Sequence, residues 1–536
     1  MTPEDISSIA LTVLGSIGTA GAIVFGMSSP RRADCNPPNE CITHTHLPHM
    51  MLDQVRLDVS AKLDQSRRSE LGQFMTPSNV ARFMANLFTV GTLENARLLD
   101  AGAGIGSLAG AFFDRWAAGD FSFRHVELTA YEIDGTLRER LSHTLAHYAG
   151  RLDLDSEIMG EDFIEDAVNR IQFQTPRRFT HAILNPPYKK IASHSRHRLL
   201  LRQVGIETVN LYTAFVALAV AQMEPGGQIV AIIPRSFCNG PYYRPFREFL
   251  LERTAIRHMH LFAARDKAFK DDAVLQENVI LLLECGGVQS EISISTSTDD
   301  RFDDYVVHAH PFERVVFPDD PERFIHVPTS PEWGAIELSS AFTYLLADIG
   351  VDVSTGPVVD FRLKEHLRDM PEPGSMPLLY PCHFDGQAIA WPKPEGKKPN
   401  ALMLNAETAK WFYPNGYYAV VRRFSSKEEK RRIVASLVTP EAFTTTSLGF
   451  ENHLNVFHEV KQGLPADLAR GLVVYLNATM IDECFRRFSG HTQVNATDLK
   501  RMKYPSRDAL IALGRWASTR GVMSQEQIDK KIESIA

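Results

Sequence analysis

The sequence predicts an α/β protein with a doubly wound, mainly parallel sheet, followed by a second domain of mixed α+β structure. Between residues 96 and 285, short apolar runs alternate with amphipathic runs, as strands alternate with helices in such sheets. A polar stretch at 286–300 ends this pattern. Residues 301–450 are rich in Pro and in short β-like runs, and helical character returns over 464–536.

Length and composition are those of an ordinary globular protein. The chain has 536 residues, 44% hydrophobic and 23% charged, which is enough for two or three domains with a large core. The formal net charge of −8 argues against an overall basic coat for nucleic acid. It leaves room for a local basic face, which is all that nucleic-acid binding requires.

Cysteine usage points to a reducing compartment. The six cysteines are scattered, and none forms a CxxC pair. A chain of this size with so few cysteines is typical of a cytoplasmic protein rather than a disulfide scaffold.

Residues 1–54 form an N-terminal extension with its own pattern. Residues 6–27 carry no charge and are long enough to span a bilayer, and Arg31 and Arg32 follow them. Three interpretations stay open: an upstream extension of an enzyme that starts at Met50 or Met51, a membrane anchor that keeps the enzyme in the cytoplasm, or a buried or disordered tail.

A cysteine and histidine cluster follows the uncharged run. Its members are Cys35, Cys41, His44, His46 and His49. The spacing matches no standard zinc finger, so a linker is the favoured interpretation and no metal is expected.

The expected strands and helices follow in chain order. The strands are Arg97–Asp100, Leu128–Ile133, Glu157–Gly160, His181–Leu184, Gln228–Ile233, Arg257–Leu261 and Asn278–Leu283. The last two could form an antiparallel pair at the sheet edge. The clearest helices are Leu108–Trp116, Asn210–Met223, Tyr243–Arg253, Asp467–Leu476 and Gln525–Ser534.

The first three expected strands end in residues suited to a nucleoside-like ligand. After the first comes a glycine-rich turn, which lets the backbone approach a ligand closely; its candidate residues are Asp100, Ala101, Gly102, Gly104 and Gly106. Glu132, followed by Ile133, can accept hydrogen bonds from ribose hydroxyls. Asp162 can accept from an adenine amino group while Phe163 packs on the ring. Because the carboxyl ends of parallel strands share one edge, these residues should converge.

The decisive motif follows the fourth strand: Asn185, Pro186, Pro187 and Tyr188. The amino group of adenine is a poor nucleophile because its lone pair is delocalised into the ring. The Asn185 side-chain oxygen and the Pro186 carbonyl can each accept one of its N–H groups, which favours a tetrahedral nitrogen. Two prolines stiffen the turn, and Tyr188 supplies a flat face for a base that has left the duplex.

With these motifs the sequence resembles the gamma-class DNA adenine-N6 methyltransferases of type II restriction–modification systems, the subgroup typified by the PstI and XhoI modification enzymes. Upstream, Phe74, Thr76 and Pro77 resemble the family motif that touches the methionine end of the cofactor. Phe269, with the acidic and apolar residues after it, resembles the motif that helps to sandwich the target base. Segments 354–362, 451–455 and 490–499 resemble the family's C-terminal half.

The resemblance implies a Rossmann-like, seven-stranded catalytic domain over residues 55–290 that uses S-adenosyl-L-methionine. It implies a DNA target-recognition domain over 301–510, a helical tail over 511–536, double-stranded DNA as the substrate, and a restriction endonuclease of the same site as a partner. A basic run could contact that DNA: Arg422, Arg423, Lys430, Arg431 and Arg432. Acidic neighbours suit a solvated helix equally well.

Other functions stay open at this point. Protein-glutamine methyltransferases resemble the same pattern but lack a large C-terminal domain. An RNA target has no positive signal. A non-catalytic DNA-binding specificity subunit is disfavoured by the intact Asn185–Tyr188 turn.

Overall fold

The computed structural model describes residues 75–175, 178–262, 277–318, 320–328, 341–386, 388–425, 429–488 and 493–536. All of these residues fall within one compact unit of the chain, 46–536. The expectations for the N-terminal extension and its cysteine and histidine cluster, and for Phe74 and Phe269, lie outside the described residues. Within those residues no helix is both long enough and apolar enough to cross a membrane.

A nine-stranded sheet forms the first part of the structure, with the strand order β3-β2-β1-β4-β5-β7-β6-β8-β9. Its strands are β1 (Asn95–Ala101), β2 (His125–Tyr131), β3 (Leu154–Met159), β4 (Phe179–Leu184), β5 (Met223–Pro234), β6 (Thr254–Phe262), β7 (Asn278–Cys285), β8 (Ile292–Ser297) and β9 (Val306–His310). Strands β1 to β5 pair in parallel, and β7 runs antiparallel to both β5 and β6.

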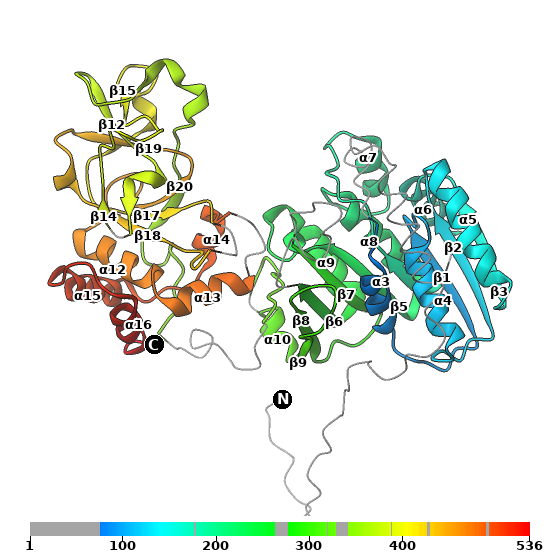
Figure 1. The fold of residues 1–536 in the computed structure, drawn as a ribbon. Helices are drawn as coiled ribbons and strands as arrows, with labels where there is room; N and C mark the ends of the chain where they lie inside the picture. Colours follow the sequence, from blue (N-terminus) through cyan, green and yellow to red (C-terminus); the bar gives the residue numbers. More distant parts are fainter. Residues whose placement is uncertain are drawn as a thin grey trace, which may run out of the picture. The chain divides into compact units, whose positions relative to one another are not determined.

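Helices cover both faces of this sheet (Figure 1). They are α3 (Ser78–Asn86), α4 (Ser107–Ala117), α5 (Gly135–Ala149), α6 (Phe163–Gln172), α7 (Arg196–Gln203), α8 (Leu211–Gln222) and α9 (Arg244–Arg253), with a short α10 (Phe312–Val315). The predicted doubly wound α/β fold is therefore confirmed.

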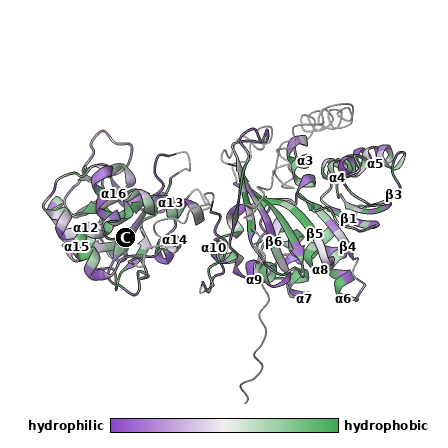
Figure 2. Cartoon of the chain, turned by 90° about the horizontal axis from the view of Figure 1, so that it is seen from below, coloured by the Kyte–Doolittle hydropathy of each residue, from purple (hydrophilic) through white to green (hydrophobic). Residues whose placement is uncertain are grey.

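The two faces of the sheet build two separate cores. Because successive strand residues point to opposite faces, Leu98 packs in the core with α3, α4 and α5, while Leu99 packs in the core with α6, α8 and α9. All residues of β4 are buried, and the central strands are strongly apolar (Figure 2). Burial on both faces is the reason that these strands are continuous apolar runs.

The sheet is larger than predicted and extends past the expected domain boundary. The seven expected strands are present, but β8 pairs in parallel with β6 and β9 pairs with β8, so the predicted antiparallel pair does not form the edge. In the segment predicted as a polar boundary, Ile292 and Ile294 are buried. The hydroxyl of Ser295 is hydrogen-bonded to two buried histidines of β6, His258 at 2.7 Å and His260 at 2.9 Å. A strand of alternating Ile and Ser therefore lies in the polar stretch at 286–300, where the sequence predicts that the pattern of the first domain ends.

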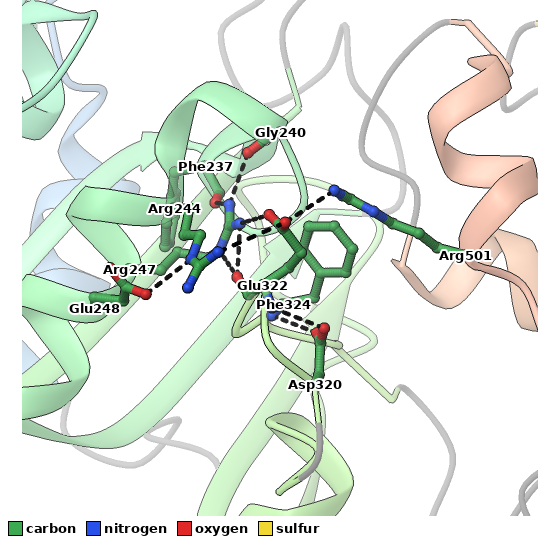
Figure 3. Close-up of polar contacts among 9 residues, drawn as sticks. All are labelled: Phe237, Gly240, Arg244, Arg247, Glu248, Asp320, Glu322, Phe324 and Arg501. Atoms are coloured by element: carbon green, nitrogen blue, oxygen red, sulfur yellow. Dashed lines mark hydrogen bonds and ion pairs between the residues drawn. The ribbon is translucent and has the colours of Figure 1, made fainter.

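The chain that follows β9 is anchored to α9 by a fully buried arginine, Arg247 (Figure 3). Its guanidinium donates to the backbone carbonyls of Phe237, Gly240 and Glu322 at 2.8 to 3.0 Å, and lies over the ring of Phe324 at 4.9 Å. Burial lowers the pKa of Arg247 to about 10, so the group is still charged at neutral pH. These hydrogen bonds compensate for the loss of water around a buried charge.

The second part contains small sheets, in which the strands pair antiparallel except for one parallel pair in the five-stranded sheet, and a helical layer. One sheet has the order β10-β20-β17-β18, a second β11-β15-β12-β19-β16, and a third β13-β14. The strands are β10 (Asp352–Thr355), β11 (Leu367–Arg368), β12 (Ser375–Leu379), β13 (Phe384–Asp385), β14 (Ala388–Ile389), β15 (Ala401–Met403), β16 (Phe412–Pro414), β17 (Tyr418–Arg422), β18 (Ala435–Val438), β19 (Ser447–Phe450) and β20 (Leu454–His458). The helices are α12 (Ala466–Leu476), α13 (Thr479–Phe488), α14 (Ala496–Arg501), α15 (Arg507–Ser518) and α16 (Gln525–Glu533).

The helical layer and one sheet share a core. Ile528 and Ile532 of α16 are buried in the same cluster as Leu472 of α12 and Val421 of β17. The predicted helical tail over 511–536 is therefore packed into the core of this unit.

Helices α12 and α15 approach each other through glycine. A Cβ atom on Gly514 would lie 1.7 Å from the carbonyl oxygen of Asp467, and one on Gly471 would lie 1.9 Å from that of Leu510. These distances leave no room for a methyl group unless the helices move apart.

Replacing Gly514 with alanine should therefore destabilise this part of the protein. Overpacking of this kind typically costs about 1–3 kcal/mol. Urea unfolding of the purified variant measures the loss. Gly521→Ala is the matched control, because a Cβ there meets nothing within 4 Å. Equal stability of Gly514→Ala and the parent would show that the helices do not meet at these glycines.

Candidate cofactor and catalytic site

The carboxyl ends of β1, β2 and β4 and the residues after β3 surround one cavity of about 240 Å³. Its lining residues are Met75, Thr76, Gly102, Ala103, Gly104, Ile105, Ser107, Leu108, Tyr131, Glu132, Ile133, Leu137, Glu161, Asp162, Phe163, Ile164, Asn185, Pro187, Lys189, His197, Leu211 and Phe215. Glu132 and Asp162 thus converge with Asn185 on one cavity, as predicted, whereas Asp100 does not line it.

The glycine turn after β1 forms the floor of the cavity. Gly102, Gly104 and Gly106 have φ angles of 84°, 58° and 86°, a backbone conformation that residues other than glycine rarely adopt. The N–H groups of Gly102 and Ala103 both donate to the carbonyl of Tyr131 at 2.9 Å. The turn is therefore bonded to the end of β2, and α4 begins directly after it.

Glu132 ties the ends of β1 and β2 together. Its carboxylate accepts a hydrogen bond from the N–H of Gly104 at 2.9 Å and one from the N–H of Asp134 at 2.8 Å. Burial raises the pKa of Glu132, and the two backbone N–H groups oppose the rise. Arg138 donates to the carbonyls of Glu132 and Ile133 at 3.0 and 2.9 Å, and these hydrogen bonds stabilise the turn after β2.

Asp162 caps the next helix and bonds to a histidine from α7. Its Oδ1 accepts from the N–H of Glu165 at 3.1 Å, and its Oδ2 lies 3.1 Å from Nε2 of His197. Burial alone would raise the pKa of Asp162, but the hydrogen bond and charge of His197 outweigh it, so the pKa lies below its usual value. The same hydrogen bond raises the pKa of His197.

The turn after β4 places Asn185 and Pro187 on the cavity wall. The amide nitrogen of Asn185 donates to the hydroxyl of Thr76 at 2.9 Å. Tyr188 does not line the cavity; its hydroxyl donates to the carbonyl of Ile232 at 3.2 Å, and its ring meets that of Tyr212 edge-on. The ring is only partly buried.

Comparisons with known proteins identify the family of this chain. Residues 120–269 match the model of the Eco57I restriction-modification methylase family. The type II methyltransferase M.BsuBI of Bacillus subtilis is 53% identical over 491 residues, which cover 90% of this chain and 97% of that protein. The chain belongs to the type II restriction–modification methyltransferases. M.PstI of Providencia stuartii is 40% identical over 91% of the chain and 98% of its own length.

A solved structure shares the fold of this methyltransferase at low sequence identity. The DrdV–DNA complex aligns with 89% of this chain and 60% of the other chain, with a TM-score of 0.53 and 12% identity. At that identity the likeness concerns the fold alone.

The cavity also contains residues of the methyltransferase that were not predicted from the sequence. Lys189, His197, Leu211 and Phe215 line it, and the ring of Phe215 lies 5.0 Å from that of Phe163. Of the predicted cofactor residues, Pro77, Asp100, Ala101 and Gly106 are not among the lining residues.

Asp100 lies fully buried behind the glycine turn. Within the described residues no group donates a hydrogen bond of good geometry to its carboxyl oxygens. Burial raises the pKa of Asp100 to about 7, the nearby Ala109 N–H opposes the rise, and the charge of Glu132 adds to it.

This pKa predicts an unusual pH dependence of the methyltransferase's stability. Between the ordinary pKa of 3.8 and about 7, the unfolded chain has lost the Asp100 proton that the folded chain keeps. Stability from this group therefore falls as pH rises through that window, by about 1.4 kcal/mol per pH unit, and is constant above it. Asp100→Asn removes the effect. The free energy of unfolding of Asp100→Asn, measured in urea, should increase relative to that of the parent as pH rises from 5 to 7. A difference between the two proteins that does not change with pH would contradict the raised pKa.

The basic run predicted to contact DNA is largely engaged within the protein. Arg432 is fully buried, its backbone N–H donates to Asp482 at 2.7 Å, and its side chain donates to Ser425 at 3.1 Å. Arg431 donates to the carbonyl of Ala478 at 3.0 Å. The local charge pattern gave no sign that these two face the core. Lys430 is exposed.

The other two arginines of that run lie where the family-like segments meet. Arg422 pairs with Glu429, and Arg423 donates to the carbonyl of Asn452 at 3.2 Å. The N–H of Val494 donates to the carbonyl of Arg423 at 2.7 Å, and Val358 bridges to Glu451. Segments 354–362, 451–455 and 493–495, distant in sequence, therefore meet around the end of β17. Phe361 and Phe424 beside them are 64% and 43% exposed.

Proposed function

We propose that this methyltransferase transfers a methyl group from S-adenosyl-L-methionine to the N6 amino group of an adenine in a specific DNA sequence. The Asn185–Tyr188 turn carries the proposal, because it follows β4 directly and opens onto the cavity that the acidic strand ends surround. The chain's membership of the type II methyltransferases supports DNA as the substrate.

The donor set of the cavity fits S-adenosyl-L-methionine. When bound, this cofactor supplies a methyl group on a positively charged sulfur. We assign Glu132 to the ribose hydroxyls and Asp162 to the adenine amino group, since both are carboxylates at successive strand ends. Phe163, which the sequence predicts to pack on the adenine ring, lines the cavity together with Ile133 and Phe215, and these three would provide its apolar walls. We expect no metal; among the described residues no group of three or more His, Cys, Asp or Glu side chains could hold one.

Asn185 and Pro186 would act on the target amino group itself. Their oxygens accept its two N–H groups, which draws the nitrogen lone pair out of the ring and directs it toward the methyl group. In such a transfer the N–C bond would form as the S–C bond breaks, S-adenosyl-L-homocysteine would leave, and the extra proton of the nitrogen would pass to water. Pro187 stiffens the turn that holds both oxygens in place.

Tyr188 would stack on the flipped adenine. Tyr188→Ala removes a face that is worth about 1–3 kcal/mol, so the flipped state should be less populated. The fluorescence of 2-aminopurine at the target position reports flipping. Tyr188→Phe or Trp keeps the face and should retain much of the activity. If the Tyr188→Ala enzyme flips the target base and methylates it like the parent, the tyrosine only stabilises the turn, through its hydrogen bond to the carbonyl of Ile232. Phe269 remains the proposed second face.

Residues 301–510 would recognise the DNA. The exception is β9 (Val306–His310), which belongs to the first sheet. We keep Arg422, Arg423 and Lys430 as proposed DNA contacts, because Lys430 is exposed and the two arginines lie at the end of β17 where the family-like segments meet. Arg431 and Arg432 would act indirectly by packing this region.

A labelled-methyl assay separates this function from the alternatives. The protein is incubated with labelled S-adenosyl-L-methionine and, in parallel, with DNA, RNA or release-factor protein, and the labelled product is digested and identified. Label in N6-methyladenine from DNA is expected. Label in cytosine, in RNA or in glutamine would replace the proposal with the corresponding activity, and binding without transfer would indicate a specificity subunit.

A further inference from the structure

The side chain of Asn185 is held by a residue far away in the sequence. Its Nδ2 donates to Oγ1 of Thr76 at 2.9 Å, across 109 residues of chain. Thr76 is 4% exposed and lies just before α3, and both residues line the cavity. The hydrogen bond therefore joins the start of α3 to the turn after β4.

The bond holds one end of the Asn185 amide in place. A side-chain amide has an accepting oxygen and a donating nitrogen on opposite sides of one planar group. If the amide turned over, its N–H groups would face the N–H groups of the target amine, and neither could accept. In the orientation that the structure has, the Thr76 hydroxyl accepts from Nδ2, and the amide oxygen lies on the side away from Thr76. A hydroxyl can donate as well as accept, so Thr76 holds the amide in place rather than excluding the opposite orientation, and the acceptor is positioned before the base arrives.

We propose that Thr76 is a positioning residue for methyl transfer, in that its hydroxyl holds the Asn185 amide where its oxygen can meet the target amino group. This rests on the proposed function and differs from the sequence-based expectation, which gave Thr76 to the methionine end of the cofactor. The two roles have different consequences: a positioning role affects the rate of the chemical step, whereas a cofactor contact affects affinity.

Thr76→Val tests the proposal, since valine has nearly the same shape and lacks the hydroxyl. The single-turnover rate of methylation at saturating cofactor should fall by about tenfold, the effect of one neutral hydrogen bond. The dissociation constants for S-adenosyl-L-methionine, from calorimetry, and for DNA should be unchanged, which also shows that the variant is folded. Thr76→Ser restores the hydroxyl and should recover most of the rate.

A double variant provides the sharpest control. With Asn185→Ala already present, Thr76→Val should lower the residual rate no further, because the group that it positions is gone. Additive losses would overturn the proposal, as would a Thr76→Val enzyme with weaker cofactor binding and an unchanged rate. If the parent itself labels no adenine in DNA, the proposed function fails first; if it does and Thr76→Val matches it, only this inference fails.

Discussion

Replacing Asn185 with alanine is expected to lower the rate of methyl transfer by about a hundred- to a thousandfold. The side-chain oxygen is needed most when the amino nitrogen changes shape, so its loss affects the transition state more than the bound state. Binding of cofactor and of DNA should stay close to that of the parent.

Single-turnover methylation measures the loss, and calorimetry and DNA binding measure what is retained. Asn169→Ala, on the exposed face of α6, is the matched control and should behave like the parent. An Asn185→Ala enzyme that methylates at more than a tenth of the parent rate would remove Asn185 from the chemical step.

Replacing Glu132 has the second largest expected effect, on cofactor affinity. The carboxylate is buried, and each hydrogen bond that a charged group makes is worth about 1.5–3 kcal/mol. Loss of one such bond to the ribose should weaken binding of S-adenosyl-L-methionine by at least tenfold in Glu132→Ala. Glu132 also accepts from Gly104 and Asp134, so part of the loss would come from the turn itself.

Glu132→Gln separates these two contributions. It keeps an oxygen for one backbone N–H but cannot accept at both ends, so its affinity should lie between those of the parent and Glu132→Ala. Glu127→Gln is the control, because Glu127 is exposed near the start of β2, the strand that Glu132 directly follows. Calorimetry that finds the same affinity in Glu132→Ala and the parent would exclude Glu132 from the cofactor site.

The sequence predicted the strands of the sheet and the residues at their ends, because two physical signals coincide there. Strands buried on both faces are continuous apolar runs, and the polar residues after them must lie at one sheet edge. Glu132, Asp162 and Asn185 could be brought together on that ground alone, and the cavity contains all three.

Other features depend on contacts that no local pattern shows. His197 and Phe215 reach the cavity from helices whose orientation is decided by packing on α6 and β4, and Thr76 meets Asn185 only in the folded chain. The sequence pattern around Arg432 predicts a solvated charge, yet the residue is buried and hydrogen-bonded to Ser425 and Asp482. In β8 the polar residues face buried histidines rather than water, so the segment lacks the apolar run of the other strands.

Methylation mapping most directly tests the central claim that this chain modifies adenine in a specific DNA sequence. Single-molecule sequencing is applied to DNA from cells that express the parent or Asn185→Ala. The parent should modify adenine at one position of one short sequence throughout the genome, and Asn185→Ala should leave that position unmodified. Unmodified adenine in cells with the parent, or modification confined to cytosine, would contradict the account.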